Sequence, residues 1–123
     1  MENDREKEFK KRLYSLVLRI IKFVENCKKS QTTRIVGDQL IRSGTSILGN
    51  YIEGQSASSK RDYTNYFHHS LKSANESKVW VSILRDTGNG EKGEANTILA
   101  ELDEISKIFG SSVLTLKGKR NNI

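Results

Sequence analysis

Hydrophobic residues recur at helical spacing over four long stretches of the chain, and polar connections separate these stretches. Apolar side chains three and four positions apart lie on one face of an α-helix. The pattern predicts helices at about residues 4–28, 33–53, 59–85 and 91–109. The absence of proline agrees with long uninterrupted helices. Because the connections are short, an all-α single domain is expected over residues 1–123, folded as an up-down antiparallel four-helix bundle.

Local signals predict where these helices begin and end. Thr32 or Thr33 suits the N-cap of the second helix, because a hydroxyl accepts a hydrogen bond from a first-turn N–H. Gly54 suits the C-terminal stop of the same helix. Gly110 is expected to interrupt the fourth helix, with a last turn that resumes through Leu116 left open, and the basic tail at residues 117–123 is expected to fray.

The second predicted helix carries a polar stripe on the side away from its apolar residues. At 100° per residue, five polar side chains share an arc about 80° wide. Short polar side chains weaken a helix, so we expect this stripe to pack against another helix or another chain. A solvated face is the alternative. With a carboxylate of the third helix, the expected polar network comprises Gln39, Arg42, Ser43, Ser46, Asn50, Glu53 and Glu76.

Two carboxylates of this network, Glu53 and Glu76, are expected to be partly buried. Arg42 and Glu53 are eleven residues apart on one helix, roughly 16 Å, and so cannot pair with each other. Each then needs a partner from elsewhere, because an unpaired buried charge is costly. A structural network is the expectation. Contact with a ligand or nucleic acid, and acid–base work by the carboxylate pair, are the alternatives.

The first predicted helix has nearly two apolar faces, although a helix in a monomeric bundle needs only one. The core stripe is expected to hold Phe9, Leu13, Leu16, Ile20, Val24 and Cys27. Tyr14, Leu18 and Ile21 lie on a different side. Burying apolar surface contributes about 25 cal/mol per Å² before association costs. We therefore predict that Tyr14, Leu18 and Ile21 form an interface in a homo-oligomer.

The net charge of +6 is unevenly distributed. Residues 1–34 hold ten Lys and Arg against five Asp and Glu, whereas residues 86–109 hold two against six. The basic surface could bind RNA, with repeated weak phosphate contacts in an oligomer. Alternatively the chain is a structural or adaptor protein that binds another protein, and its charges serve subunit contacts. The candidate nucleic-acid residues are Lys11, Arg19, Lys22, Lys29, Lys60, Arg61, Lys117, Lys119 and Arg120.

Candidate chemistry is sparse. His68 and His69 are adjacent and point about 100° apart on a helix, so they cannot share a metal. Cys27 falls in the apolar stripe and suits a core position. With no nucleophile, metal set or phosphate loop, we expect a protein that is not an enzyme and needs no cofactor. No apolar run approaches the roughly 20 residues of a membrane span. The single cysteine and the charged N-terminus favour the cytoplasm.

Three blocks of residues carry a resemblance to a known family. The second-helix block comprises Gln39, Leu40, Arg42, Ser43, Ser46, Ile47, Asn50, Glu53 and Gly54. The third-helix block comprises Ser73, Ala74, Glu76 and Trp80. The last-helix block comprises Glu101, Leu102, Ile105, Lys107, Ile108, Leu116 and Lys117. Together they resemble the bacterial four-helix-bundle proteins encoded in 23S ribosomal RNA intervening sequences. This chain departs from the family pattern at Gly44 and Gly49, where Ala is frequent, and at Val81, where Leu is usual.

The resemblance implies a small cytoplasmic bundle that assembles into a ring-like homo-pentamer. It also implies a distant relationship to the accessory variability protein of diversity-generating retroelements, a basic bundle oligomer that binds nucleic acid and associates with a reverse transcriptase. The intervening-sequence branch itself has no assigned biochemical function, so the resemblance supplies a fold and an assembly but no activity.

Overall fold

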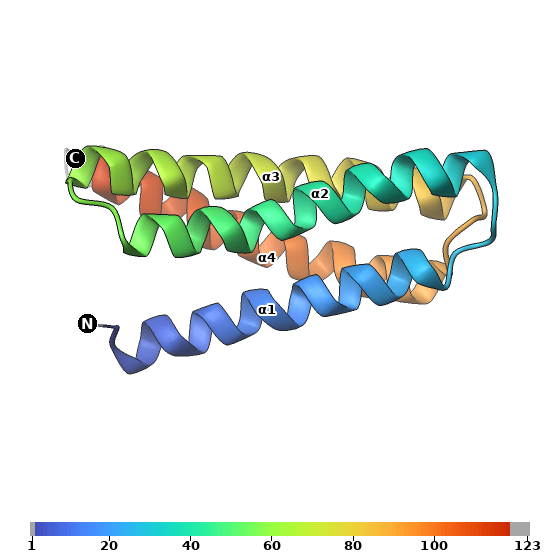
Figure 1. The fold of residues 1–123 in the computed structure, drawn as a ribbon, viewed down its shortest axis with the longest axis horizontal. Coiled ribbons are helices and arrows are strands. Elements are labelled where there is room, and N and C mark those ends of the chain that lie inside the picture. Colours follow the sequence, from blue (N-terminus) through green and yellow to red (C-terminus); the bar gives the residue numbers. More distant parts are fainter. Residues whose placement is uncertain (1, 119–123) are drawn as a thin grey trace.

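The computed structural model describes residues 2–118, which form four α-helices with no strand among them. The helices are α1 (Asp4–Glu25), α2 (Gln31–Gln55), α3 (Lys60–Asp86) and α4 (Lys92–Leu116). They lie side by side around one core (Figure 1). The predicted all-α fold class and the single domain are confirmed.

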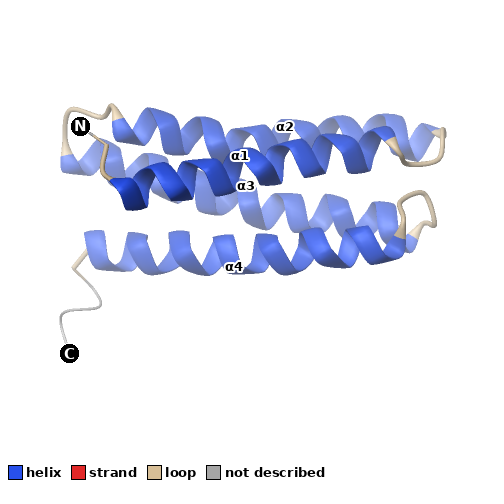
Figure 2. Cartoon of the chain, turned by 90° about the horizontal axis from the view of Figure 1, so that it is seen from below, coloured by secondary structure: helices blue, strands red, loops and turns tan. Residues whose placement is uncertain are grey.

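Helices that follow one another in the chain pack together, most closely α2 with α3, and α1 also meets α4 over a shorter length. Early residues of one helix meet late residues of the next. The Phe9 ring lies 5.2 Å from that of Tyr51, whereas Ile20 packs at Gly44. Within the described residues no Cα atom of α1 lies within 8 Å of a Cα atom of α3. These two helices therefore present different sides of the molecule to solvent, as Figures 1 and 2 show.

The inward face of α1 is wider than its predicted stripe. Four of the six predicted residues are buried, and Phe9 and Val24 pack partly buried against the core. Val17 and Phe23 are also buried, although the stripe omitted them. The reason is that α1 touches both α2 and α4, so its buried arc extends toward each neighbour. The largest fully buried side chains are Leu13, Ile20, Leu40, Ile47, Val81, Leu84, Ile98, Leu102, Ile105 and Phe109.

Aromatic rings from all four helices close one end of the core. Phe9, Tyr51, Phe67 and Phe109 lie with ring centroids between 5.2 and 6.3 Å apart, mostly edge to face. Such edge-to-face pairs add to the free energy of burial. Burial raises the pKa of Tyr51 to about 12, with a further contribution from nearby Glu6. This cluster anchors the ends of the helices near the N-terminus of α1.

The predicted boundaries of the first two helices need correction. α1 ends at Glu25 and not near residue 28, and α2 begins at Gln31 and not at residue 33. The N-cap of α2 is Ser30, whose Oγ accepts a hydrogen bond from the backbone N–H of Thr33 at 3.0 Å. The capping hydroxyl therefore belongs to a residue two positions before Thr32 and three before Thr33.

Gly54 was misinterpreted as a helix end, and Gly110 as an interruption of a helix. Gly54 lies within α2, which runs on to Gln55, and a Cβ there would lie 3.2 Å from the Cβ of Tyr66. Its role is close packing of α2 on α3. Gly110 lies inside α4, which continues to Leu116. Val113 is buried beyond it, so packing of the last turns outweighs the roughly 1 kcal/mol that an interior glycine costs a helix.

Candidate functional surfaces

The predicted polar network is not enclosed within one protomer. Only Ser43 is buried, with its Oγ 2.7 Å from that of Ser77 on α3. Arg42, Glu53 and Glu76 are exposed, which corrects the expectation that the two carboxylates are partly buried. The Glu76 carboxylate accepts a hydrogen bond from Trp80 Nε1 at 3.1 Å, one turn away on the same helix.

Most of the stripe faces outward along the seam between α2 and α3. The Ser43–Ser77 contact marks the line where the two helices meet. At 100° per residue, Ser46 and Asn50 of α2 lie just outside that line. Both are half-buried, and the Asn50 amide donates to the Ser46 carbonyl at 2.9 Å. Within the described residues, no side-chain hydrogen bond or ion pair is made by Gln39, Arg42 and Glu53.

A half-buried carboxylate with two hydrogen bonds from one arginine lies elsewhere, at Glu101 on α4. Arg12 of α1 donates to it twice, at 2.7 and 2.8 Å, and contacts Glu104 at 3.2 Å. Hydrogen bonds from Arg12 hold the pKa of Glu101 below its usual value, against the opposing effect of burial. A carboxylate held ionised by a guanidinium suits structure and not proton transfer. The sequence indicated the Arg12–Glu101 pair only through the basic first helix and the acidic last helix, which meet within one chain.

The basic candidates divide into paired and unpaired groups. Arg19 pairs with Glu94 of α4 at 2.8 Å, and Lys11 meets Glu8 at 3.8 Å with both side chains about three-quarters exposed. Lys119 and Arg120 lie outside the described residues. No ion pair within the described residues is formed by Lys22, Lys29, Lys60, Arg61 and Lys117.

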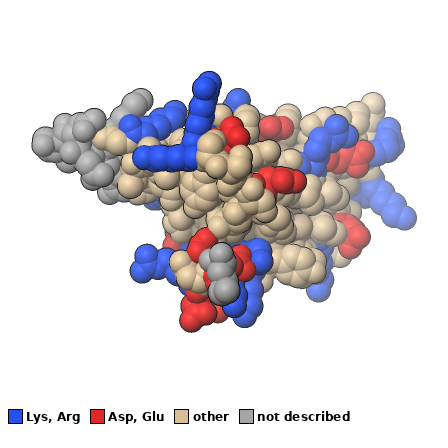
Figure 3. Space-filling view, turned by 60° about the vertical axis from the view of Figure 1, so that its left-hand side comes forward, with Lys and Arg blue, Asp and Glu red and all other residues tan. Residues whose placement is uncertain are grey.

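The unpaired cations occupy two ends of the molecule. Lys29 lies beside the start of α2 and Lys60 beside the start of α3, so the length of α2, about 37 Å, separates them. Figure 3 shows basic and acidic side chains interspersed over the face that it presents. At the end where α3 begins, burial and then the positive charges of Lys117 and Lys72 lower the pKa of His68. Lys72, which sequence reasoning did not select, is exposed part-way along α3.

Two of the three predicted interface residues are strongly exposed. Tyr14 is 56% exposed and Leu18 is 51% exposed, whereas Ile21 is half-buried. Tyr14 borders a hollow of about 500 Å³ between α1 and α2, which Leu48 and Ile52 also line. The second apolar face of α1 thus exists and continues onto α2.

The described residues contain no group of three or more His, Cys, Asp and Glu side chains that could hold a metal ion. Cys27 is buried, its Sγ donates to the Phe23 carbonyl at 3.2 Å, and burial raises its pKa. A buried thiol with a raised pKa is a poor nucleophile. None of the helices described has the length and apolar character to cross a membrane.

Comparison with known proteins decides the family. The family model described as 23S rRNA-intervening sequence protein matches residues 5–111. The chain belongs to this family. The resemblance carried by the three motif blocks is thereby confirmed. The motif residues differ in burial. Ser43 is buried against α3, whereas Arg42, Glu53 and Glu76 face solvent.

A solved structure supports the same assignment. This member of the 23S rRNA-intervening sequence protein family is similar to a protein of unknown function from the S23 ribosomal protein family of Bacteroides thetaiotaomicron. The two chains are 31% identical with a TM-score of 0.76, over 85% of this chain and 96% of the other. No curated protein matches. Family membership therefore establishes the fold and leaves the activity to be argued from the surface.

Proposed function

We propose that this protein is a non-enzymatic cytoplasmic scaffold, an up-down bundle that self-associates into a ring-like homo-oligomer and binds structured RNA. The observation that carries RNA binding is the unpaired basic group at the end where α3 begins, which comprises Lys60, Arg61 and Lys117. These side chains are exposed and, within the described residues, no carboxylate neutralises them. Other basic residues, such as Arg12 and Arg19, are already engaged by α4.

Self-association should strengthen the weak RNA binding that we expect of a single copy. One copy presents three such cations, which gives weak and salt-sensitive binding. In an oligomer the same group recurs on every subunit, and the effective concentration of the second contact rises. Exposed stacking aromatics are scarce in this basic group, so recognition depends on charge and shape rather than on base sequence.

The experiment is a filter-binding titration with a structured RNA at 50 and 200 mM salt. We expect binding at the lower salt and a steep loss at the higher one, because each phosphate contact releases counterions. Absence of binding at 50 mM salt by a folded protein would refute the RNA proposal. A polyglutamate competitor at equal charge checks that the signal is not general anion exchange.

A second candidate function is a protein adaptor, favoured by the outer stripe of α2. Arg42 and Glu53 are exposed opposite charges with no partner among the described residues, and Ser46 and Gly49 between them are small. Such a surface suits another protein chain better than a phosphate backbone. Recovery of one protein partner in a pulldown that survives nuclease treatment would favour this function, and loss of that partner in an Arg42→Glu variant would place it on α2.

A further inference from the structure

The outward face of α1 carries a stripe in which apolar residues lie between basic ones. Lys11, Tyr14, Leu18, Lys22 and Glu25 fall within about 80° of one another at 100° per residue. All five are exposed, and the two apolar side chains keep more than half of their surface in solvent. From Lys11 to Glu25 this α1 stripe is about 21 Å long.

The outward face of α3 carries a stripe of the same length and the opposite charge order. Lys72, Glu76, Val79, Ile83 and Asp86 also fall within about 80° and span about 21 Å. Val79 is 52% exposed, and with Ile83 and Asp86 it borders a hollow of about 430 Å³. This α3 stripe places an apolar centre between two carboxylates.

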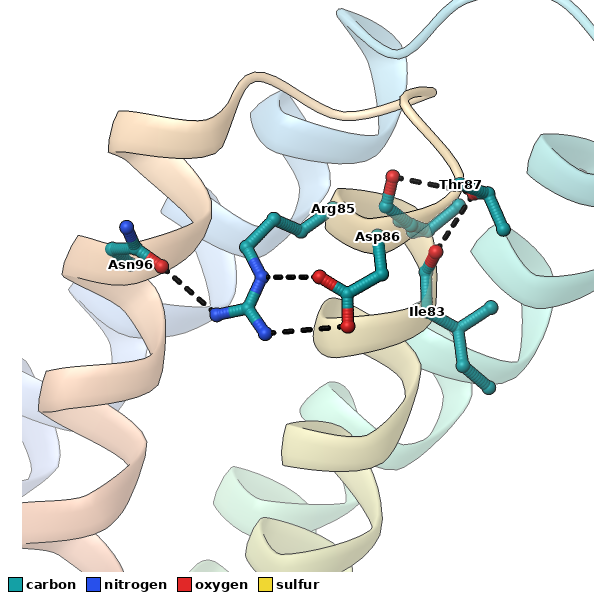
Figure 4. Close-up of polar contacts among 6 residues, drawn as sticks. Ile83, Arg85, Asp86, Thr87 and Asn96 are labelled. Atoms are coloured by element: carbon teal, nitrogen blue, oxygen red, sulfur yellow. Dashed lines mark hydrogen bonds and ion pairs between the residues drawn. The ribbon is translucent and has the colours of Figure 1, made fainter.

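The carboxylates of the α3 stripe retain capacity to accept further hydrogen bonds. Asp86 receives Arg85 Nε at 2.8 Å, while Arg85 also donates to Asn96 of α4 at 2.9 Å (Figure 4). Among the residues that the structure describes, Glu76 accepts only the hydrogen bond from the Trp80 indole. An ionised carboxylate has about four acceptor sites, so each can also bind a lysine from outside.

We propose that the α1 stripe of one copy packs antiparallel on the α3 stripe of a second copy. In this register the facing pairs are Lys11 with Asp86, Tyr14 with Ile83, Leu18 with Val79, Lys22 with Glu76, and Glu25 with Lys72. Each apolar residue meets an apolar residue, and each charge meets its opposite. A parallel register instead places Lys7, on the same face of α1, opposite Lys72, and leaves Glu25 without a partner.

The position of the stripes determines the kind of assembly. Because α1 and α3 are not neighbours in the bundle, their outward stripes lie on different sides of the molecule (Figure 1), and one partner does not cover both. The contact is therefore head to tail, and such contacts produce closed rings or open filaments. This inference rests on the self-association proposed above and adds which surfaces meet. It also assigns Lys11 and Lys22 to subunit contact and leaves RNA to the basic group at the start of α3.

Charge exchange within one chain tests the pairing. Lys22→Glu alone and Glu76→Lys alone should each weaken subunit association at least about tenfold, since like charges then face each other. The double variant K22E/E76K restores the pair and should return to within about threefold of the wild type. Sedimentation velocity over a concentration series measures the association. Lys28→Glu and Asp38→Lys are the matched controls, because they make the same charge changes on exposed residues outside both stripes and outside the basic group at the start of α3.

The results separate this inference from self-association itself. A wild-type mass near 14 kDa at all concentrations refutes both proposals. A wild-type oligomer that both single variants leave intact, or that the double variant fails to restore, refutes the stripe pairing while self-association stands. Far-UV circular dichroism confirms that each variant is folded.

Cysteine cross-linking tests the register. L18C/V79C should form disulfide-linked chains of increasing size, because the antiparallel contact brings these two positions together in neighbouring copies. L18C/I83C is one turn away and should cross-link poorly, since a disulfide needs Cβ atoms about 3.5–4.5 Å apart. Efficient cross-linking by the second variant and not the first would overturn the antiparallel register. The native Cys27 is buried, so it should not form disulfides between copies.

Discussion

At the scale of single residues, α2 provides two interior glycines with opposite surroundings. A Cβ at Gly37 would lie 2.8 Å from Val24 Cγ1, whereas a Cβ at Gly49 has nothing within 4 Å. Gly49→Ala should raise the free energy of unfolding by about 1 kcal/mol, through helix propensity alone. The free energy of unfolding of Gly37→Ala should be at least about 1 kcal/mol lower than that of Gly49→Ala, because overpacking offsets the same gain in helix propensity. Urea unfolding of the two variants measures the difference, and equal stabilities would contradict the close packing at Gly37.

Single residues also show how much of the structure could be predicted from the sequence. Helical periodicity identified the outward positions of Tyr14 and Leu18, because a side chain's face depends only on its spacing. Periodicity also placed Glu53 and Glu76 in a polar seam, but it could not give their depth. Depth depends on which edge of α2 meets α3, and that edge is set by contacts such as Ser43 with Ser77. Gly54 was misinterpreted for a related reason, since a glycine that ends a helix and one that admits a neighbour look alike in a sequence.

At the scale of helices, α1 is fastened to α4 by the Arg12–Glu101 pair, which gives stability a dependence on pH. The pKa of Glu101 is lowered in the folded protein, so its contribution is present at neutral pH and is lost as the pH falls below the ordinary glutamate value, about 4.3, toward the lowered one. Between pH 7 and pH 3.5 the free energy of unfolding should therefore fall by roughly 1 kcal/mol less in Glu101→Gln than in the wild type. This figure is already discounted for the partial exposure of the pair. Chemical unfolding at both values measures this. Glu8→Gln, at an exposed carboxylate, should behave like the wild type.

The arrangement of helices followed from sequence more readily than their ends did. Four periodic segments with short connections leave few ways to bury four apolar stripes, so the fold class was predictable. The ends depended on single hydrogen bonds, such as the one to Ser30 Oγ, and on burial of Val113 beyond an interior glycine. The pairing of α1 with α4 required two residues 89 positions apart to meet, and charge composition indicated only that such a pairing was favourable.

At the scale of the whole molecule, the proposals separate the RNA-binding surface from the subunit interface, and this separation is testable. Lys60→Gln with Arg61→Gln should lower RNA affinity and reduce the slope of log affinity against log salt by about 2, if each cation meets one phosphate. The mass of the particle should remain that of the wild type, because both residues lie outside the α1 and α3 stripes. Leu18→Asp should instead reduce the mass of the particle, because Leu18 lies in the α1 stripe and not in the basic group.

RNA binding by the Leu18→Asp variant should then weaken only through loss of multivalency. Its salt slope per copy should stay near that of a wild-type subunit, because no phosphate contact has been removed. Filter binding and light scattering on the same preparations measure both quantities. If the Lys60 and Arg61 replacements changed the mass, or left the salt slope unaltered, the RNA-binding surface would have to lie elsewhere, with Lys29 at the other end of α2 as the next position to replace.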